Sequence, residues 1–232
     1  MNYFRDLLLS LLVAMVALSS CRKEEEIIPS SRVRVGVPGR PGKIKGFFLL
    51  NEANMGSNKA TLDYYDYTTA FYTRNIYAER NPNVVKELGD VGNDLQIHGS
   101  RLYAVINVSG LIEVMDVRTA KHIGKLSIPN CRYIAFKDGF AYVSSYAGPV
   151  KIDPNARLGY VAKVDTATLK VVAECPVGYQ PEELLIHGDK LYVANSGGYR
   201  APNYDKTISI IDLKTFTEEK QVDVAINLHR LQ

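Results

Sequence analysis

The residues that could do chemistry in this 232-residue chain are few, and their spacing argues against catalysis. Glu182 and Glu183 are adjacent carboxylates, but neighbouring side chains of an extended chain point apart and cannot flank one scissile bond as glycosidase carboxylates do. The sequence contains no Ser-His-Asp spacing, phosphate-cradling glycine loop or zinc motif. We therefore predict a protein that is not an enzyme and that holds no cofactor and no metal.

The four histidines are the next candidates for ligand or metal contacts. His98 and His187 occupy the same place in two copies of a repeat, so we interpret them as repeat positions and not as metal ligands. His122 stands alone in a strand-like segment, which predicts a structural role. His229, beside Arg230, lies in a connecting segment and is the histidine most worth testing.

Two cysteines, Cys131 and Cys175, lack the His partner and the paired spacing of catalytic or zinc-binding cysteines. An exported protein could join them in a disulfide. However, each lies at the edge of a strand pattern in adjacent repeats, so two separate packed thiols are an equal alternative.

The elements that would position these residues are repeated β-hairpins. An apolar strand, a polar turn and an apolar-aromatic strand occur three times and align without gaps, in residues 95–107, 133–145 and 184–196. Gly99, Gly139 and Gly188 fall in the turns, where a tight hairpin needs a positive φ.

A second hairpin follows each of these, with an Asp-x-x-Thr turn at Asp116, Asp165 and Asp212. The Asp side chain can cap the backbone amides of such a turn. Two hairpins at a period of roughly 40–50 residues are typical of a four-stranded β-propeller blade. An earlier blade is expected at residues 47–77, with Asp66 at the turn position.

The sequence therefore predicts an all-β fold, with about four propeller blades in residues 46–232 and the start of a fifth at residues 225–232. Helical periodicity is absent after residue 45. Four blades would leave the ring open, so we expect an incomplete propeller, either a fragment of a longer one or a truncated gene product.

The N-terminal segment predicts export and a lipid anchor. An apolar run at residues 7–18 suits a secretory signal and is shorter than the about 20 residues that span a bilayer. It ends in Leu-Ser-Ser-Cys21, which resembles a bacterial lipobox, so residues 1–20 are expected to be removed and Cys21 to be acylated. The alternative is an ordinary signal peptide with an accidental cysteine. Residues 21–45, rich in Pro and Gly, are expected to form a flexible tether.

Acidic residues 24–26 follow Cys21 directly. Such a run is often only a solvated face, but here it resembles the surface-export signal of lipoproteins from Bacteroidetes-type bacteria. The resemblance implies the outer face of the outer membrane, with the membrane contacted by the lipid anchor alone. The formal net charge is +3 without clustered Lys and Arg, so nothing suggests a nucleic-acid partner.

Ligand contacts are expected where the loops between the second and third strands of each blade meet the connections between blades, because both open on one face. The loops at residues 145–159 and 196–206 are longer than turns require, and loops on a rigid scaffold commonly carry function. Their Tyr and Arg side chains could contact a flat polar ligand, or the loops are merely long and solvated. The candidate ligand-binding residues are Asn54, Asn107, Arg132, Tyr146, Tyr179, Gln180, Tyr199, Arg200, Tyr204, His229 and Arg230.

A family resemblance rests on residues 46–66 (GFFLLNEANMGSNKATLDYYD), 185–198 (LIHGDKLYVANSGG) and 208–216 (ISIIDLKTF). These segments resemble YncE-like propeller lipoproteins of Bacteroidetes-type bacteria, over essentially residues 46–232. Within that group the pattern is close to surface lipoproteins that capture cobalamin and pass it to a TonB-dependent outer-membrane transporter. The resemblance implies a seven-bladed complete propeller, a corrinoid ligand and a transporter partner. Alternatives are a surface module that binds glycans or proteins, and an enzyme of the streptogramin-lyase type, which the lack of a His-rich face opposes.

Overall fold

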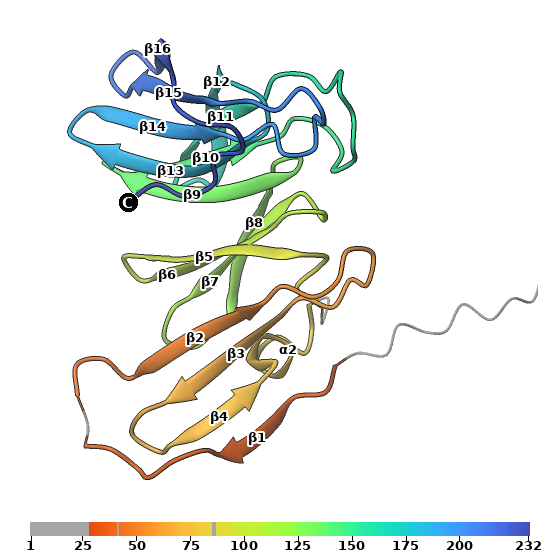
Figure 1. Ribbon diagram of the computed structural model, residues 1–232. Coiled ribbons are helices and arrows are strands. Elements are labelled where there is room, and N and C mark those ends of the chain that lie inside the picture. Colours follow the sequence, from red (N-terminus) through yellow and green to blue (C-terminus); the bar gives the residue numbers. More distant parts are fainter. Residues whose placement is uncertain (1–27, 41, 85–86) are drawn as a thin grey trace, which may run out of the picture.

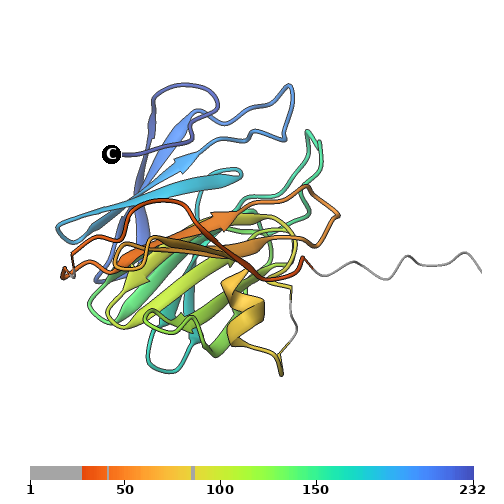
Figure 2. The same ribbon diagram turned by 90° about the horizontal axis from the view of Figure 1, so that it is seen from below.

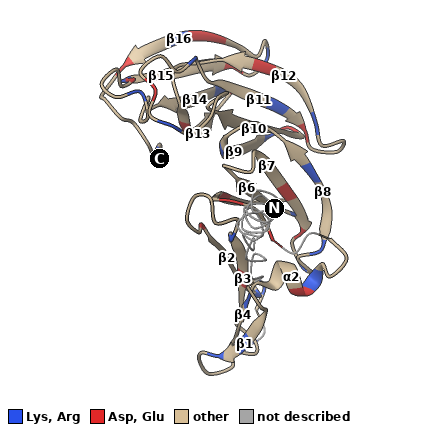
Figure 3. Cartoon of the chain, turned by 90° about the vertical axis from the view of Figure 1, so that its right-hand side faces the viewer, with Lys and Arg blue, Asp and Glu red and all other residues tan. Residues whose placement is uncertain are grey.

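The computed structural model describes residues 28–40, 42–84 and 87–232. The predicted signal peptide (1–20), Cys21 and the acidic run at 24–26 lie outside the described residues. Within them the chain forms four antiparallel sheets of four strands each, which follow one another as an open arc of blades (Figures 1 and 3). The all-β propeller prediction is thereby confirmed, with four blades, while the number of blades in a complete ring stays a prediction.

The strand order across each sheet is as follows. Blade 1 has β1 (Ser31–Arg34), β4 (Phe71–Arg74), β3 (Thr61–Asp66) and β2 (Gly46–Asn51). Blade 2 has β5 (Gly92–His98), β6 (Arg101–Ile106), β7 (Leu111–Asp116) and β8 (His122–Ser127). Blade 3 has β9 (Cys131–Lys137), β10 (Phe140–Ser145), β11 (Tyr160–Asp165) and β12 (Lys170–Pro176). Blade 4 has β13 (Pro181–His187), β14 (Lys190–Asn195), β15 (Thr207–Asp212) and β16 (Thr217–Asp223).

The turn aspartates act as the sequence predicts. The Oδ1 atoms of Asp66, Asp116, Asp165 and Asp212 each accept hydrogen bonds from two backbone N–H groups of their own turn, at 2.7–3.2 Å. A side chain that satisfies these amides stabilises the tight connection between the last two strands of a blade. The repeated aspartate therefore sets the same turn in all four blades.

The gapless alignment of the three hairpins is one residue out of register in blade 3. Gly99 and Gly188 are the first residues of their two-residue turns, whereas Gly139 is the second. Asp138 takes the first position with a φ of 51°, a conformation that Asp adopts more readily than bulkier residues. All three turns contain two residues, so an alignment that matches their glycines without gaps places the strands of blade 3 one residue out of step with those of blades 2 and 4.

The hydrophobic core lies between the blades. Successive side chains of a strand point to opposite faces, so Leu102 and Ala104 of β6 are buried against blade 1. Tyr103 and Val105 of the same strand are buried against blade 3. Each blade with two neighbours thus contributes one face to each neighbouring core. Figure 2 shows the blades from below.

Two elements depart from the sequence prediction. Residues 31–34 belong to the predicted tether but form β1, which pairs with β4 from Ser31↔Arg74 to Arg34↔Phe71. The helix α2 (Ile76–Arg80) links blades 1 and 2, although no helical periodicity predicts it. Five residues are too few for a period to show, and the helix forms because Ile76 and Tyr77 are buried in the core between these blades. No helix in the described part of the chain is long and apolar enough to cross a membrane.

Cys131 and Cys175 are separate buried thiols, which settles the alternative that the sequence left open. The Sγ of Cys131 lies 3.4 Å from the Leu111 carbonyl oxygen. Burial raises the pKa of Cys131 to about 12 and also raises the pKa of Cys175. Neither thiol is ionised near neutral pH, so neither is a reactive nucleophile.

The core between blades predicts a contrast between two residues of one hairpin. Leu102→Ala is expected to lower the free energy of unfolding by about 2–5 kcal/mol, because it leaves a cavity between blades 1 and 2. Ile97 on β5 is 58% exposed, so Ile97→Ala is expected to change it by less than about 0.5 kcal/mol. Urea unfolding followed by circular dichroism measures both, and equal losses would contradict this packing.

Candidate ligand-binding site

The long loops and the connections between blades meet at one end of the blades, as the sequence predicts. The residue after the second strand donates a backbone hydrogen bond to the connection in front of the first strand in three successive blades. The pairs are Asn107 to Val91 at 2.7 Å, Tyr146 to Asn130 at 3.2 Å and Ser196 to Gln180 at 3.2 Å. We call this end of the blades the loop face.

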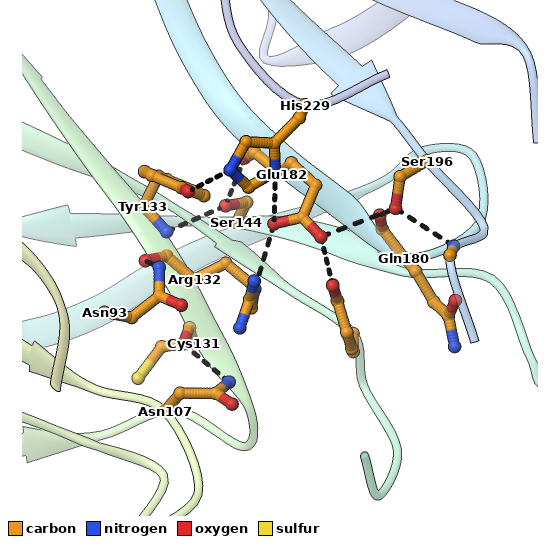
Figure 4. A network of polar contacts seen from close by, with 12 residues as sticks. Asn93, Asn107, Cys131, Arg132, Tyr133, Ser144, Gln180, Glu182, Ser196 and His229 are labelled. Carbon is orange, nitrogen blue, oxygen red and sulfur yellow. Dashed lines mark hydrogen bonds and ion pairs between the residues drawn. The ribbon is translucent and has the colours of Figure 1, made fainter. Parts of the chain in front are cut away.

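A polar network centred on Glu182 lies at the loop face between blades 3 and 4 (Figure 4). The Glu182 side chain is buried, and its Oε2 accepts a hydrogen bond from Arg132 Nε at 3.0 Å. Its Oε1 accepts from the Tyr146 hydroxyl and from Ser196 Oγ at 3.4 Å. The Glu182 carbonyl accepts from Ser144 Oγ at 2.7 Å, so the whole residue is held in place.

The inner strands bring these side chains together through β-bulges. The pairing of β5, β9 and β13 with their second strands shifts register just after the first residue of each inner strand. Asn93, Arg132 and Glu182 occupy the equivalent bulge position in the three blades. A bulge re-aims its side chain, and here two of the three reach the next blade: the Asn93 amide donates to the Arg132 carbonyl, and the Arg132 guanidinium donates to Glu182.

His229 continues this series beyond blade 4. The Ile134 N–H donates to Asp94 Oδ2 at 3.1 Å, and the Leu231 N–H donates to Glu183 Oε2 at 2.6 Å in the equivalent place. His229 therefore stands at the next bulge position, with its Nδ1 3.9 Å from Glu182 Oε2 and its Nε2 3.0 Å from the Tyr133 hydroxyl.

Burial and the Glu182 charge keep Arg132 and Tyr146 in their protonated forms. Burial opposes the charge of Arg132, but the Glu182 carboxylate more than compensates, and the pKa of Arg132 is raised. Burial and the nearby Glu182 charge raise the pKa of Tyr146, so its hydroxyl remains a donor. The Arg132 guanidinium lies 5.0 Å from the centroid of the Tyr146 ring, which adds a cation–π contact. A buried ion pair with additional hydrogen bonds makes a rigid polar floor.

A pocket of about 360 Å³ adjoins this floor. Tyr146 and Gln180 form the side shared with the network, and the loop after Tyr146 supplies the rest, including Lys151, Asp153 and Arg157. Its volume lies in the range of about 300–1,000 Å³ found for small-molecule sites. Aromatic, amide and charged groups are therefore available together at one edge of the loop face.

Two of the predicted site residues, Tyr146 and Gln180, line this pocket. Arg132 and His229 lie beside it at the Glu182 network. Tyr179, Tyr199 and Arg200 lie beside it at the second long loop and the connection in front of β13. The Tyr199 ring lies 6.3 Å from the Tyr146 ring, and the Tyr199 N–H donates to Gln180 Oε1 at 2.6 Å. Their roles as ligand contacts remain predictions.

Arg200 is held by the protein itself. Its guanidinium lies 3.4 Å from the centroid of the Tyr179 ring and donates to the carbonyls of Asn203 at 2.7 Å and Pro154 at 3.2 Å. These bonds join the two long loops, and the Asp153 N–H adds a backbone bond to the Tyr199 carbonyl at 2.8 Å. Arg200 therefore clamps the loops in position.

The other four predicted residues lie apart from the pocket and from the contacts around it. Asn107 is buried and donates to the Cys131 carbonyl at 3.0 Å, which is a structural contact. Asn54 belongs to blade 1 and lines a different pocket there. Tyr204 and Arg230 are exposed.

Glu182 is the residue that sequence reasoning missed. Adjacent glutamates do point apart, as expected, but this separation aims Glu182 at Arg132 and Glu183 at the backbone of Leu231. Arg132 and Glu182 carry opposite charges at the same position of consecutive repeats, and this was the signal available in the sequence. The one-residue shift of the blade 3 alignment hid it.

Two of the other histidines contact neighbouring side chains. The His98 ring stacks on Phe136 with centroids 4.5 Å apart, and His122 Nδ1 contacts the buried Glu113 carboxylate. Among the described residues, no group of three or more His, Cys, Asp or Glu side chains is placed to hold a metal ion.

The fold and the site define a β-propeller with a polar site at one end of its blades. Residues 45–173 match the family described as a domain of unknown function (DUF5074), and the chain belongs to that family. No curated protein matches the chain.

Solved structures share the arrangement of the blades. The chain is similar to the computationally designed Ika8 protein, with a TM-score of 0.54 and 14% identity over 83% of this chain and 51% of that one. It is also similar to Sqt1 of Saccharomyces cerevisiae, with a TM-score of 0.53 and 11% identity over 80% of this chain and 50% of that one. Apo AztD from Citrobacter koseri gives a TM-score of 0.51 and 14% identity over 82% of this chain and 47% of that one. The chain spans about half the length of these structures. Identities this low support the fold alone.

The buried ion pair predicts a strong dependence on its carboxylate. Glu182→Gln is expected to lower the free energy of unfolding by about 3–5 kcal/mol, because it leaves the Arg132 charge buried without a counter-charge. The double variant Arg132→Met/Glu182→Leu removes both charges and is expected to recover most of that loss. Urea unfolding measures each variant.

The exposed ion pair between Lys214 Nζ and Asp189 Oδ2, 2.8 Å apart, serves as the matched control. Lys214→Met is expected to leave the unfolding midpoint nearly unchanged, because exposed pairs are screened by solvent. A Glu182→Gln variant as stable as this control would show that Arg132 does not need its partner.

Proposed function

We propose that this protein is a surface-displayed binding module that captures a small organic ligand at the loop face and catalyses no reaction. The observation that carries the proposal is the placement of Tyr146, which lines the pocket while its hydroxyl is bonded to the buried Glu182. A pocket wall held in place before binding loses little conformational freedom when a ligand enters beside it.

A corrinoid suits the chemistry of this surface and is the ligand that the family resemblance implies. The partly exposed Tyr199 offers an aromatic face, while the exposed Lys151 and Arg157 offer partners for the amide groups around a corrin ring. A corrinoid is larger than the pocket of about 360 Å³, so it would insert one edge there and lie across the loop face.

Delivery to a TonB-dependent transporter completes the proposal. Its support is the lipobox ending at Cys21, the acidic run behind it and the family resemblance. The acyl chains would hold the propeller on the outer face of the outer membrane, where a captured ligand can be passed to a channel in the same membrane.

A second candidate is a module that binds a glycan or a protein. The exposed apolar residues of the first long loop favour it, since Ile152 is 75% exposed and Leu158 is 48% exposed. A macromolecular partner would cover these side chains, whereas a ligand confined to the pocket would leave them in water.

The corrinoid proposal predicts binding by the full chain in detergent. Isothermal titration with cyanocobalamin is expected to give saturable heat, and Tyr199→Ala is expected to weaken binding about tenfold, or about 1.4 kcal/mol. This substitution removes the ring but keeps the backbone bond to Gln180. Tyr67→Ala in a turn of blade 1 is the control and should bind as the unsubstituted chain does. Absence of heat and of any spectral change would exclude the corrinoid and favour glycan and protein screens.

The anchor proposal predicts the fate of the protein in cells. Cys21→Ser is expected to abolish incorporation of labelled palmitate and to move the protein from the membrane fraction to the soluble fraction. Cys175→Ser is the control, because that thiol is buried in the propeller. Undiminished palmitate labelling of Cys21→Ser would refute the lipobox assignment.

A further inference from the structure

The strand β2 begins at the end of blade 1 that lies opposite the loop face. Gly46 pairs with Asp66, whose side chain caps the turn between β3 and β4. We call the end of the blades that carries these aspartate turns the turn end. A tether that ran freely from Cys21 to β2 would therefore join the propeller at its turn end.

The strand β1 changes this entry point, because it carries the chain along the outer edge of blade 1 before β2 begins. Its pairing with β4 runs from Ser31↔Arg74 at the loop face to Arg34↔Phe71 at the turn end. Figure 1 shows that β1 begins on the side where the long loops of blades 3 and 4 lie. The described chain thus enters at the loop face and reaches the turn end only after β1.

Backbone hydrogen bonds hold the chain at the turn end after β1. The Val35 N–H donates to the Ala70 carbonyl at 3.0 Å, and the Gly39 N–H donates to the Tyr67 carbonyl at 2.9 Å. Both acceptors belong to the turn between β3 and β4. The chain turns back into β2 only from this point.

The start of the described chain is held at the loop face by polar side chains. Ser30 Oγ lies 3.0 Å from the Arg74 carbonyl oxygen and 3.1 Å from Glu79 Oε2, and its hydroxyl can donate to either. The Asn75 amide donates to the Ile28 carbonyl at 2.7 Å. Ile28 is therefore fixed beside the start of α2, at the connection between blades 1 and 2.

The linker between the predicted lipid anchor and blade 1 is short. It consists of the seven residues 21–27, which reach at most about 25 Å when fully extended. The six residues of β3, which join the loop face to the turn end, span about 20 Å. To reach a membrane on the turn-end side, the linker would have to run back along the blade at nearly its full extension. A membrane on the loop-face side requires no such extension.

We propose that β1 orients the propeller with its loop face toward the membrane that carries the acyl chains. This orientation rests on the proposed lipid anchor at Cys21 and adds to it the side of the protein that meets the membrane. The pocket beside Tyr146 then opens toward the membrane, where a protein embedded in the same membrane can receive the ligand. Without β1, the same anchor would hold the turn end toward the membrane and the pocket away from it.

Resonance energy transfer from a labelled cysteine to headgroup-labelled lipids tests the orientation. The lipidated full chain is added to vesicles of phosphatidylethanolamine and phosphatidylglycerol that carry rhodamine-labelled phosphatidylethanolamine. Met55→Cys and Tyr67→Cys place the donor at opposite ends of blade 1, before and after β3, where the native side chains are 56% and 43% exposed. The native thiols Cys131 and Cys175 are buried and stay unlabelled.

Transfer is expected to be at least about twofold higher from Met55→Cys than from Tyr67→Cys, because the two ends of the blade differ in height by about 20 Å. Ile152→Cys and Ala167→Cys, at the two ends of β11, repeat the comparison on blade 3 and are expected to differ in the same direction. Equal transfer within the pairs, or higher transfer from the turn end, would overturn the orientation. A chain that does not join the vesicles at all would overturn the anchor itself.

Replacing residues 31–34 with Gly-Ser-Gly-Ser tests whether β1 sets the orientation. All four side chains of β1 are exposed, so the propeller is expected to fold without them. The linker would then run from Cys21 to Val35 at the turn end, and the excess transfer from the loop end is expected to be lost or reversed. Lys43→Gly/Ile44→Ser is the control, since these exposed residues lie between β1 and β2 and should leave the excess unchanged.

A longer linker tests the same orientation without touching blade 1. Inserting about 20 Gly and Ser residues between Ile27 and Ile28 lets the linker span the height of a blade without being stretched. Transfer from the loop end and from the turn end is then expected to become equal. If either this variant or the β1 variant keeps the difference of the parent chain, the docked tether does not orient the propeller and the proposal is wrong.

Discussion

A four-stranded blade can bury both faces of its sheet only by packing on two neighbours, and the architecture of this chain follows from that constraint. Leu102 and Tyr103 are consecutive residues of one strand, yet they belong to two different cores. Alternation along β6 therefore ties three blades together. The same constraint explains why Phe47 and Tyr192, at the two ends of the arc, keep exposed area that their counterparts lack.

Blade stacking also creates the polar site. Packing successive inner strands side by side brings Arg132 of β9 within a hydrogen bond of Glu182 of β13, fifty residues later in the chain. Each charge would be costly to bury alone, and together with Tyr146 and Ser196 they satisfy one another. The pocket beside them thus inherits a rigid wall from the propeller core, while the clamp at Arg200 fixes the loops above it.

The proposed ligand site uses one end of the scaffold. Ligand capture depends on the loop face between blades 3 and 4, where Tyr146 and Tyr199 lie.

The sequence by itself determined the repeat, the strand alternation and the aspartate turns, because each depends on residues a few positions apart. It also named Tyr146 and Gln180, which line the pocket, through the convergence of the long loops with the connections between blades. Only the tertiary structure decided the partner of Glu182, the strand β1, the short helix α2 and the separation of the two thiols. These depend on contacts between residues far apart in the chain, which the local sequence pattern does not record. The one-residue offset of the blade 3 hairpin, visible only in its strand pairing, hid the equivalence of Arg132 and Glu182.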